Sequence, residues 1–333
     1  MEVLVLAFFV FAFINFRLAE YGISQLYGQF AIVYNAKPIT KVLADPQFPD
    51  SLKQKLRLIE EVKRFAIDSL GLKATKNYST LYDQHGKPLL MNLTASEKFR
   101  LRAYTWNFPL LGTVSYKGFF NFESGKREAE ALEKKNYDVD YSPVSAWSTL
   151  GWFRDPVFTG MLRRNDGQLA ELIIHEMTHA TIYLKSSVDF NENLASAVGE
   201  TGAEEFLISK FGIASPELIN YKNEQDDYNR FAKHLLAGTK LLDSLYKAFG
   251  NKTDEEKEKL KEGMIRKITE ALDSIPFHNM KYKQRFNNGN LPNNAYFLSF
   301  VRYDAQKEEM KKELSEKFGG SVKKYLESFT INR

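Results

Sequence analysis

The sequence predicts an α+β protein in which a strand-containing N-terminal half packs against a mainly helical C-terminal half. Three observations lead to this prediction. Short extended runs bounded by turn residues occur before residue 165. From Asp166 onward, apolar residues recur at helical spacing almost to the end of the chain. The 333 residues, of which 44% are hydrophobic and 26% charged, are enough to bury a sizeable core.

The first segment is an unbroken apolar run from Val3 to Ile14. It is shorter than the roughly 20 apolar residues that a spanning helix needs, and it also fits the hydrophobic part of a signal peptide. The best cleavage candidate, Val10-Phe11-Ala12, matches the small-x-small pattern poorly. A buried helix is the alternative, but an exposed terminal run of this kind would promote aggregation. We therefore expect residues 1–19 to be a membrane anchor or signal segment.

Residues 20–333 are expected to form the main domain, with an α+β part at 20–165 and a helical part at 166–333. In the first part we expect helices where apolar residues recur every three or four positions and strands where they alternate. The expected elements are a helix turning to a loop over Glu20–Asn35, a helix over Ser51–Leu70 that Gly71 ends, a hairpin of Asn77–Tyr82 and Leu89–Thr94, an extended run over Thr113–Phe122, a helix over Glu123–Lys135 and an extended run over Tyr137–Trp147.

The helical part carries recognisable start and stop signals. Asp166 is a good N-cap, and a Thr followed three residues later by Glu has the pattern of a capping box. The expected helices are Leu169–Leu184, Asn191–Phe211, 217–249, one opened by Thr253-Asp254-Glu255-Glu256 and, after a Gly/Asn-rich loop at Asn287–Asn294, a charged helical stretch to Phe329.

Charge and cysteine content exclude several classes of function. The formal net charge is +4, and basic residues are mixed with acids along the chain. A nucleic-acid-binding protein would more often concentrate its basic residues on one face, so this role is disfavoured. The absence of cysteine excludes disulfides, thiolate metal sites and cysteine nucleophiles. Any metal ion must therefore be held by His, Asp or Glu.

Two of the five histidines fall in the segment His175-Glu176-Met177-Thr178-His179. On a helix, their four-residue spacing places both imidazoles on one face, where they can bind a single Zn²⁺. Glu176 is the next residue round the helix, so its carboxylate can reach a water on that metal and remove a proton as the water attacks a peptide carbonyl. The alternative is a partly buried helix whose histidines bind no metal.

A catalytic zinc needs a third protein ligand and an open position. The best candidate is Glu192, because an antiparallel return of the chain would place the first turn of the second helix opposite the end of the first. The small residues Ala195 and Ser196 would let the two helices approach closely. Taken alone, Glu192 would be interpreted as a solvated acid favoured by the helix dipole, and only its place beside the histidine helix favours the ligand. The alternative ligands are Glu200, Glu204 and Glu205.

Two further acids could orient the metal ligands without binding the metal themselves. Glu171 lies four residues before His175 on the same helix face and could orient an imidazole, or it could be a plain surface carboxylate. Glu200 lies two turns beyond Glu192 and could act in the same way. The other histidines, His85, His234 and His278, are more typical of surface or core positions.

Four segments carry a resemblance to a known family. They are the zinc motif followed by Asp189–Gly199, and the segments Pro143–Pro156, Asn293–Tyr303 and Tyr21–Gln29. Together they resemble the bacterial "putative aminopeptidase" family, which is gluzincin-like, over about residues 20 to 330. The resemblance implies a zincin-like active-site helix with Zn²⁺ held by His175, His179 and Glu192, and Glu176 as general base.

The resemblance also implies an envelope location in a Gram-negative bacterium, with the domain facing the periplasm. Two departures from the family pattern matter. A lipoprotein would carry a cysteine, so an uncleaved inner-membrane anchor is the better version here. In thermolysin-like gluzincins an Asp commonly lies four residues after the ligand Glu, whereas this chain has Ser196. The side chains that support the ligands must therefore differ.

The oxyanion formed during hydrolysis needs a hydrogen-bond donor besides the metal. Tyr303 is our candidate, with Arg302, Asn293 and Asn294 as alternatives in the same C-terminal segment. An extended peptide substrate could pair with an edge strand formed by Val144–Trp152, although this segment could equally be an ordinary strand.

An aminopeptidase also needs an acid to hold the free amine of the substrate. Asp155, Asp189 and Glu200 are all possible. The favoured interpretation is a zinc aminopeptidase acting on peptides. The alternatives are a catalytically silent envelope scaffold and a metalloenzyme that cleaves a non-peptide amide. An intact H-E-x-x-H motif favours an enzyme, because a scaffold has no need of the base Glu176. The sequence does not determine the oligomeric state.

Overall fold

The structure is a computed structural model, and it describes residues 16–108, 112–144, 154–287 and 289–331. It confirms the α+β class. The strands are β1 (Lys37–Pro38), β2 (Thr80–Tyr82), β3 (Met91–Glu97), β4 (Trp106–Phe108), β5 (Gly112–Val114), β6 (Lys117–Phe119), β7 (Tyr137–Pro143) and β8 (Val157–Phe158). The α-helices are α2 (Phe16–Asn35), α3 (Ile39–Ala44), α4 (Asp50–Asp68), α5 (Phe122–Glu133), α6 (Asp166–Thr181), α7 (Val188–Phe211), α8 (Pro216–Lys247), α9 (Asp254–Glu270), α10 (Asn294–Asp304), α11 (Lys307–Phe318) and α12 (Val322–Ile331).

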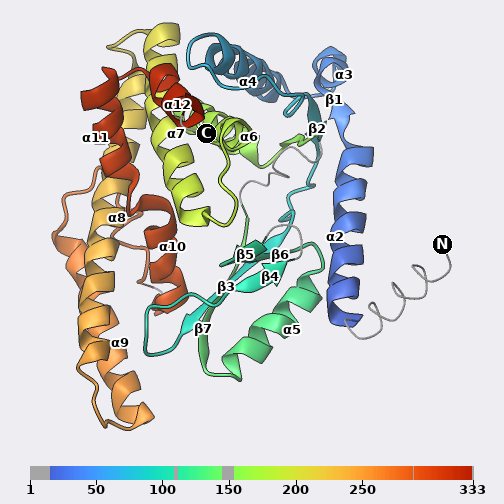
Figure 1. Ribbon diagram of the computed structural model, residues 1–333. Coiled ribbons are helices and arrows are strands. Elements are labelled where there is room, and N and C mark those ends of the chain that lie inside the picture. The colour runs from blue at the N-terminus through green and yellow to red at the C-terminus, as the bar shows by residue number, and fades with distance from the viewer. Residues whose placement is uncertain (1–15, 109–111, 145–153, 288, 332–333) are drawn as a thin grey trace.

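The main sheet is antiparallel and has β3 between β6 and β7. Alternate side chains of a strand point to opposite faces. Leu93 and Ala95 of β3 pack with Leu132 of α5 on one face. On the other face, Asp138 of β7 accepts a hydrogen bond from the backbone N–H of Asn294, the first residue of α10. The sheet therefore lies between α5 and α10, below the helices that carry the zinc motif (Figure 1).

The predicted hairpin of Asn77–Tyr82 and Leu89–Thr94 is wrong. β2 pairs antiparallel with β1 and parallel with β8, whereas β3 belongs to the main sheet. Asp155 explains the difference, because its backbone N–H and C=O bond to the Asn77 side chain and the Tyr78 N–H. These distant contacts direct the chain before β2 toward β8, and the turn after Tyr82 connects two sheets.

The helical part follows the predicted order, with shifts at two helix starts. Asn165 caps α6, while Asp166 lies in the first helical turn and forms an ion pair with Lys55. α7 begins at Val188, three residues earlier than predicted. The predicted capping box of Thr253 and Glu256 is confirmed at the start of α9.

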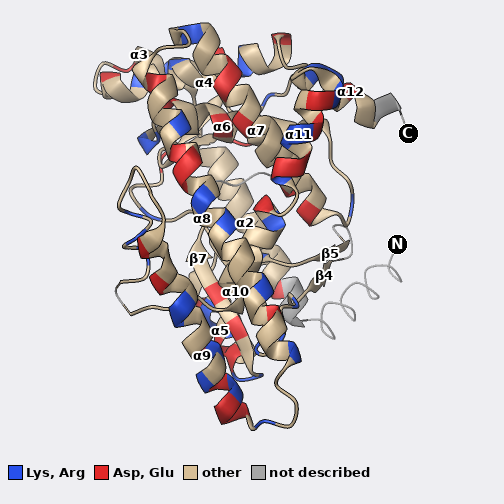
Figure 2. Cartoon of the chain, turned by 90° about the vertical axis from the view of Figure 1, so that its left-hand side faces the viewer, with Lys and Arg blue, Asp and Glu red and all other residues tan. Residues whose placement is uncertain are grey.

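The largest core joins α4, α6, α7 and α12. Fully buried side chains such as Ile59 of α4, Ile173 of α6 and Val198 of α7 belong to it. Figure 2 shows acidic and basic residues interspersed along the helices. Among the described residues, three ion pairs are buried on both sides: Asp138–Lys261, Glu200–Lys307 and Asp304–Lys307.

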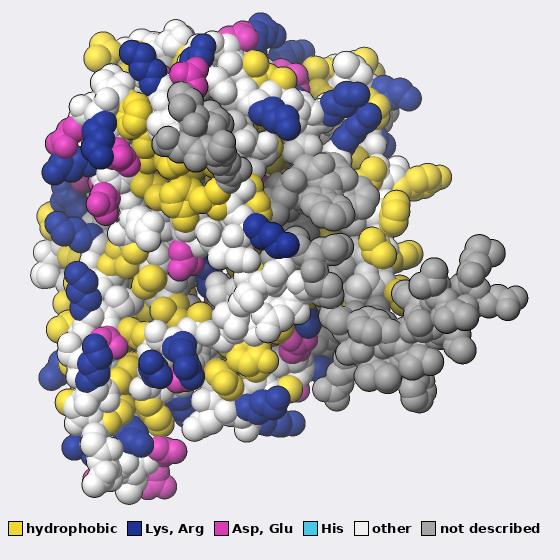
Figure 3. Space-filling view, viewed as in Figure 1, with side chains coloured by type: hydrophobic (Ala, Val, Ile, Leu, Met, Phe, Trp, Pro, Cys, Tyr) yellow, Lys and Arg dark blue, Asp and Glu magenta, His cyan; other side chains and the backbone are white. Residues whose placement is uncertain are grey.

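The predicted anchor, residues 1–19, lies largely outside the described residues. Its last residues belong to α2, which begins at Phe16 and packs along the main sheet, where Tyr21 donates a hydrogen bond to the Gly118 carbonyl. The outer face of α2 exposes apolar side chains, including Ile23, Tyr27 and Tyr34, and apolar side chains stand out on this side of the molecule in Figure 3. None of the described helices combines the length and the apolar character needed to cross a membrane.

Candidate metal centre

The zinc motif occupies the last turns of α6, which its core packing holds in place. Ile173, Ile174 and Met177 are buried against α4 and α7. Because these residues face the core, His175 and His179 lie together on the adjacent face of the helix. Their Nε2 atoms lie 3.1 Å apart, and the rings meet at an interplanar angle of 84°. Both imidazoles are largely buried, with side chains 18% and 7% exposed.

Glu192 reaches this edge from the first turns of α7. The Asn191 side chain closes the turn between the helices by accepting a hydrogen bond from the Leu184 N–H and donating one to the Leu184 carbonyl. α7 then packs against α6 (Figure 1). One carboxylate oxygen of Glu192, Oε2, lies 3.4 Å from the Nε2 atoms of both histidines. The three predicted ligands therefore converge on one point.

The separations of these atoms fit a zinc ion. Metal–ligand bonds of about 2.0–2.1 Å in a tetrahedron place the ligand atoms roughly 3.3–3.4 Å apart. The three separations here are 3.1, 3.4 and 3.4 Å. Two imidazoles and one carboxylate are also the donor set of a catalytic zinc site with an open position. Burial raises the pKa of Glu192, but the two imidazoles more than offset this and hold it well below its usual range.

Glu176 lies beside the three converging atoms and is not one of them. Its side chain is buried, and its Oε2 atom has no hydrogen-bond partner within the described residues. Burial raises the pKa of Glu176, the imidazoles of His175 and His179 oppose the rise, and the charge of Glu192 adds to it. A carboxylate with a raised pKa and a free oxygen is suited to accept a proton.

The charge of Glu192 acts on the hydroxyls of three tyrosines. Burial, followed by the charge of Glu192, raises the pKa of Tyr303, Tyr116 and Tyr183. The charge of Glu176 adds to the rise for Tyr303 and Tyr116. The role of Tyr303 as oxyanion donor stays a prediction, and the charges of both glutamates act on its hydroxyl.

Tyr116 is a further tyrosine on which the charge of Glu192 acts, and the sequence did not reveal it. It lies in the short connection between β5 and β6, and nothing in its local sequence distinguishes it from the other tyrosines of the chain, 17 in all. The Arg302 guanidinium lies 5.8 Å from the centre of its ring and donates a hydrogen bond to Ser115 Oγ. Arg302 therefore contacts both Tyr116 and the residue before it, Ser115.

The other two oxyanion candidates have structural partners. Asn293 caps α10, and its side chain also donates to the Val139 carbonyl. Asn294 is fully buried and bonds to the Glu97 and Lys98 carbonyls. Both lie at the start of α10, whereas Tyr303 lies at its end, so neither prediction is supported.

The alternative ligands are engaged away from the histidines. Glu200 pairs with Lys307 and Lys311, whose charges outweigh burial and lower its pKa. Glu204 pairs with Lys222, and no described interaction joins Glu205 to the histidines. Glu171 accepts hydrogen bonds from Tyr221 and Gln225, so neither it nor Glu200 orients an imidazole. Burial and the nearby Glu200 raise the pKa of Glu171 to about 7.

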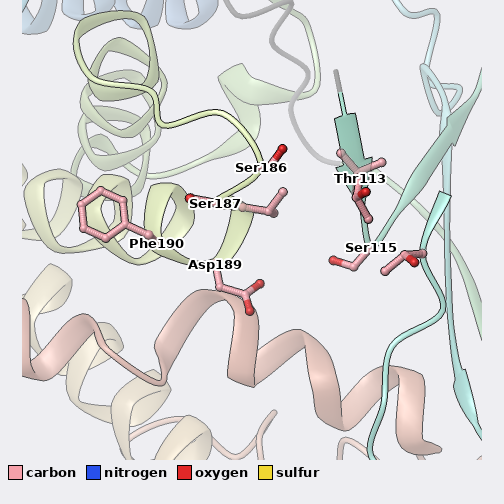
Figure 4. A pocket seen from close by; sticks show the side chains of 9 residues that line it. Thr113, Ser115, Ser186, Ser187, Asp189 and Phe190 are labelled. Atoms are coloured by element: carbon pink, nitrogen blue, oxygen red, sulfur yellow. The ribbon is translucent and has the colours of Figure 1, made fainter. Parts of the chain in front are cut away.

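The three acids proposed for the substrate amine are now distinguishable by their surroundings. Glu200 is neutralised by two lysines. Asp189 is exposed and lines a pocket of about 220 Å³ between the start of α7 and the β4–β5 hairpin (Figure 4). Asp155 is buried, and its charge raises the pKa of Glu176, the general-base candidate. Of the three acids, Asp155 is therefore the one whose charge acts on Glu176, beside the candidate metal centre.

Nearly all of the predicted edge strand Val144–Trp152 lies outside the described residues. Only Val144 is described, and its backbone N–H donates a hydrogen bond to the Leu90 carbonyl at the end of the main sheet. The β-augmentation hypothesis for the substrate stays a prediction.

The close approach of α6 and α7 depends on Gly199. A Cβ atom at this position would lie 3.1 Å from the Glu171 carbonyl oxygen and 3.2 Å from the Cβ of His175. We expect Gly199→Ala to push the helices apart, to lower the free energy of unfolding by about 1–3 kcal/mol and to weaken zinc binding. Urea unfolding and zinc titration measure the two effects.

Gly263 on α9 is the matched control, because a Cβ atom there would meet no atom within 4 Å. Gly263→Ala is expected to leave zinc binding unchanged and to stabilise the protein by up to about 1 kcal/mol. Wild-type stability and zinc affinity in Gly199→Ala would contradict the role given to this glycine.

Comparison with known proteins gives one family. A family model described as "Putative aminopeptidase" matches residues 20–330, which includes every residue of the site. No protein of curated function and no solved structure matches the chain.

Proposed function

The chain belongs to the putative aminopeptidase family, a family of peptidases by its description, and we propose that it is a zinc-dependent aminopeptidase. The observation that carries the proposal is the convergence of His175, His179 and Glu192 within 3.4 Å of one another. The free carboxylate oxygen of Glu176 beside them adds the group that hydrolysis needs.

Zinc held by the two imidazoles and Glu192 would supply a polarising cation that lowers the pKa of water and draws electrons from a peptide carbonyl. Glu176 accepts a proton at its free oxygen and can then pass it to the departing amine. The raised pKa of Glu176 suits the first transfer, because a more basic carboxylate accepts a proton more readily. The surrounding core keeps α6 and α7, and therefore these groups, in a fixed arrangement.

The preference for an amino terminus rests on the family description and on Asp155. The charge of this carboxylate acts on Glu176, and we infer that it would attract a substrate ammonium beside the bond to be cleaved. Its side chain is held by the Asn77 amide, which fixes its position. Hydrolysis of an aminoacyl reporter, compared with the same reporter carrying an N-acetyl group, tests the preference.

The function as a whole is tested by metal analysis together with peptidase assays on the purified full chain. One zinc per chain and chelator-sensitive hydrolysis of peptides are expected. A chain that binds no zinc and cleaves no peptide would instead fit a catalytically silent scaffold. A zinc protein that cleaves only non-peptide amides would fit the remaining alternative.

Tyr303 is the proposed hydrogen-bond donor to the developing oxyanion. We expect Tyr303→Phe to lower kcat by about 10²-fold with little change in KM, since the lost bond forms only in the transition state. Steady-state kinetics on a peptide substrate gives both constants. Tyr116→Phe and Tyr183→Phe are the comparison variants. A loss confined to Tyr116→Phe would transfer the role to Tyr116.

A further inference from the structure

Asn193 follows Glu192 and is completely buried. Its side-chain amide donates hydrogen bonds to two backbone carbonyls, that of Asp189 at 2.7 Å and that of Arg302 at 2.6 Å. Its Oδ1 atom accepts a third bond, 2.8 Å long, from the backbone N–H of Gln306. Both donors of the amide and its acceptor are therefore used, in a site without exposure to solvent.

These bonds join three parts of the chain. The Asp189 carbonyl belongs to the first turn of α7, the Arg302 carbonyl lies near the end of α10, and the Gln306 N–H lies just before α11. The residue after Arg302 is Tyr303, whose pKa is raised by the charge of Glu192. Asn193 thus connects the backbone that carries the carboxylate ligand to the backbone that carries the proposed oxyanion donor.

We infer that Asn193 is a positioning residue, which sets where Glu192 meets the two imidazoles and how far α10 stands from them. The inference rests on the proposed zinc site. The support for the ligand carboxylate then comes through the backbone of α10, which is bonded to the residue next to Glu192.

Only an amide fits this place. Aspartate has nearly the same shape, but it would turn a carboxylate oxygen toward two carbonyl oxygens in place of an N–H donor. A buried carbonyl that loses its donor is costly, and two oxygens facing one another repel. We therefore expect Asn193→Asp to shift α7 relative to α10 and to move Glu192 away from the histidines.

Asn294 is a closely matched control. It is also completely buried, donates to the Glu97 and Lys98 carbonyls at 2.9 and 3.1 Å, and accepts a 2.7 Å bond from the Tyr246 hydroxyl. It lies at the opposite end of α10 from Tyr303. Asn294→Asp removes the same kinds of bond from a similar environment without touching α7, so it reports the general cost of such a loss.

The test uses the full chain with either substitution and measures zinc affinity by competition with a chromophoric chelator, the visible absorption spectrum of the cobalt-substituted protein, and urea unfolding without metal. Asn193→Asp is expected to weaken zinc binding by about 10–100-fold, as losses next to metal ligands do, and to change the cobalt spectrum. Asn294→Asp should stay within about twofold of the wild-type affinity, because distant sites act independently.

The outcomes separate the inference from the proposed function. A wild-type chain that binds no zinc refutes the proposed function. A wild-type chain that binds zinc, with an Asn193→Asp variant of unchanged affinity and cobalt spectrum, overturns the role of Asn193 alone. If Asn193→Asp does not fold, Asn193→Ala and Asn294→Ala provide the same comparison. A failure of both Asn193 variants to fold, while the Asn294 variants fold, would assign Asn193 to global stability and also overturn the inference.

Discussion

Glu176→Gln is expected to keep zinc binding near the wild-type level and to lower peptide turnover by about 10³-fold, within the range that a lost general base produces. Gln has the shape of Glu, and the three converging atoms do not include Glu176, so the metal ligands stay in place. The amide cannot accept a proton at neutral pH, so the step assigned to Glu176 fails. Zinc content and single-turnover hydrolysis measure the two properties separately.

The control for this prediction is Glu204→Gln. Glu204 lies on the outer part of α7, and its carboxylate pairs with Lys222. The turnover of this variant is expected to match the wild type. A Glu176→Gln variant with normal turnover would remove Glu176 from the chemistry. Loss of zinc from the same variant would instead mean that Glu176 supports the ligands.

His175→Ala is expected to abolish both stoichiometric zinc binding and turnover. Removing one imidazole leaves two protein ligands where a zinc site needs three. Loss of zinc also removes the stabilisation that a bound ligand gives to the folded state, about 2.7 kcal/mol when free zinc is 100 times its Kd. Thermal unfolding with and without zinc measures this, and we expect a zinc-dependent rise in Tm for the wild type and none for the variant.

His85→Asn is the matched control, because His85 is a highly exposed histidine with a positive φ of 49°, which Asn tolerates. It should retain the zinc content, turnover and zinc-dependent rise in Tm of the wild type. A His175→Ala variant that still carries one zinc per chain would show that the metal binds elsewhere, and it would refute the proposed metal centre.

The predictable part of the site is the part in which the helix itself sets the geometry. His179 lies four positions after His175, and an α-helix places residues at this spacing on one face whatever the surroundings. Glu192 required one further step, a helical return, and the close packing of α6 and α7 makes this step possible through Asn191 and Gly199. The capping box at Thr253 was predictable for the same local reason.

Residues brought in by long-range contacts were not predictable. Tyr116 reaches Glu192 from a short connection between strands, and Asn193 holds the end of α10, which is more than 100 residues away. The hairpin was predicted wrongly because its turn signals are local, whereas the pairing of β2 with β8 depends on Asp155. The roles of Glu171 and Glu200 were decided by partners on α8 and α11.

By itself, the sequence determined the α+β class, the positions of most helices and the spacing of His175, Glu176 and His179, because periodicity, caps and helical spacing act within a few residues. The tertiary structure decided which acid meets the two imidazoles, which tyrosines face Glu192 and which asparagine fixes it. These outcomes depend on how helices and strands far apart in the chain pack together, and burial makes that packing specific: each buried polar group needs its own partner.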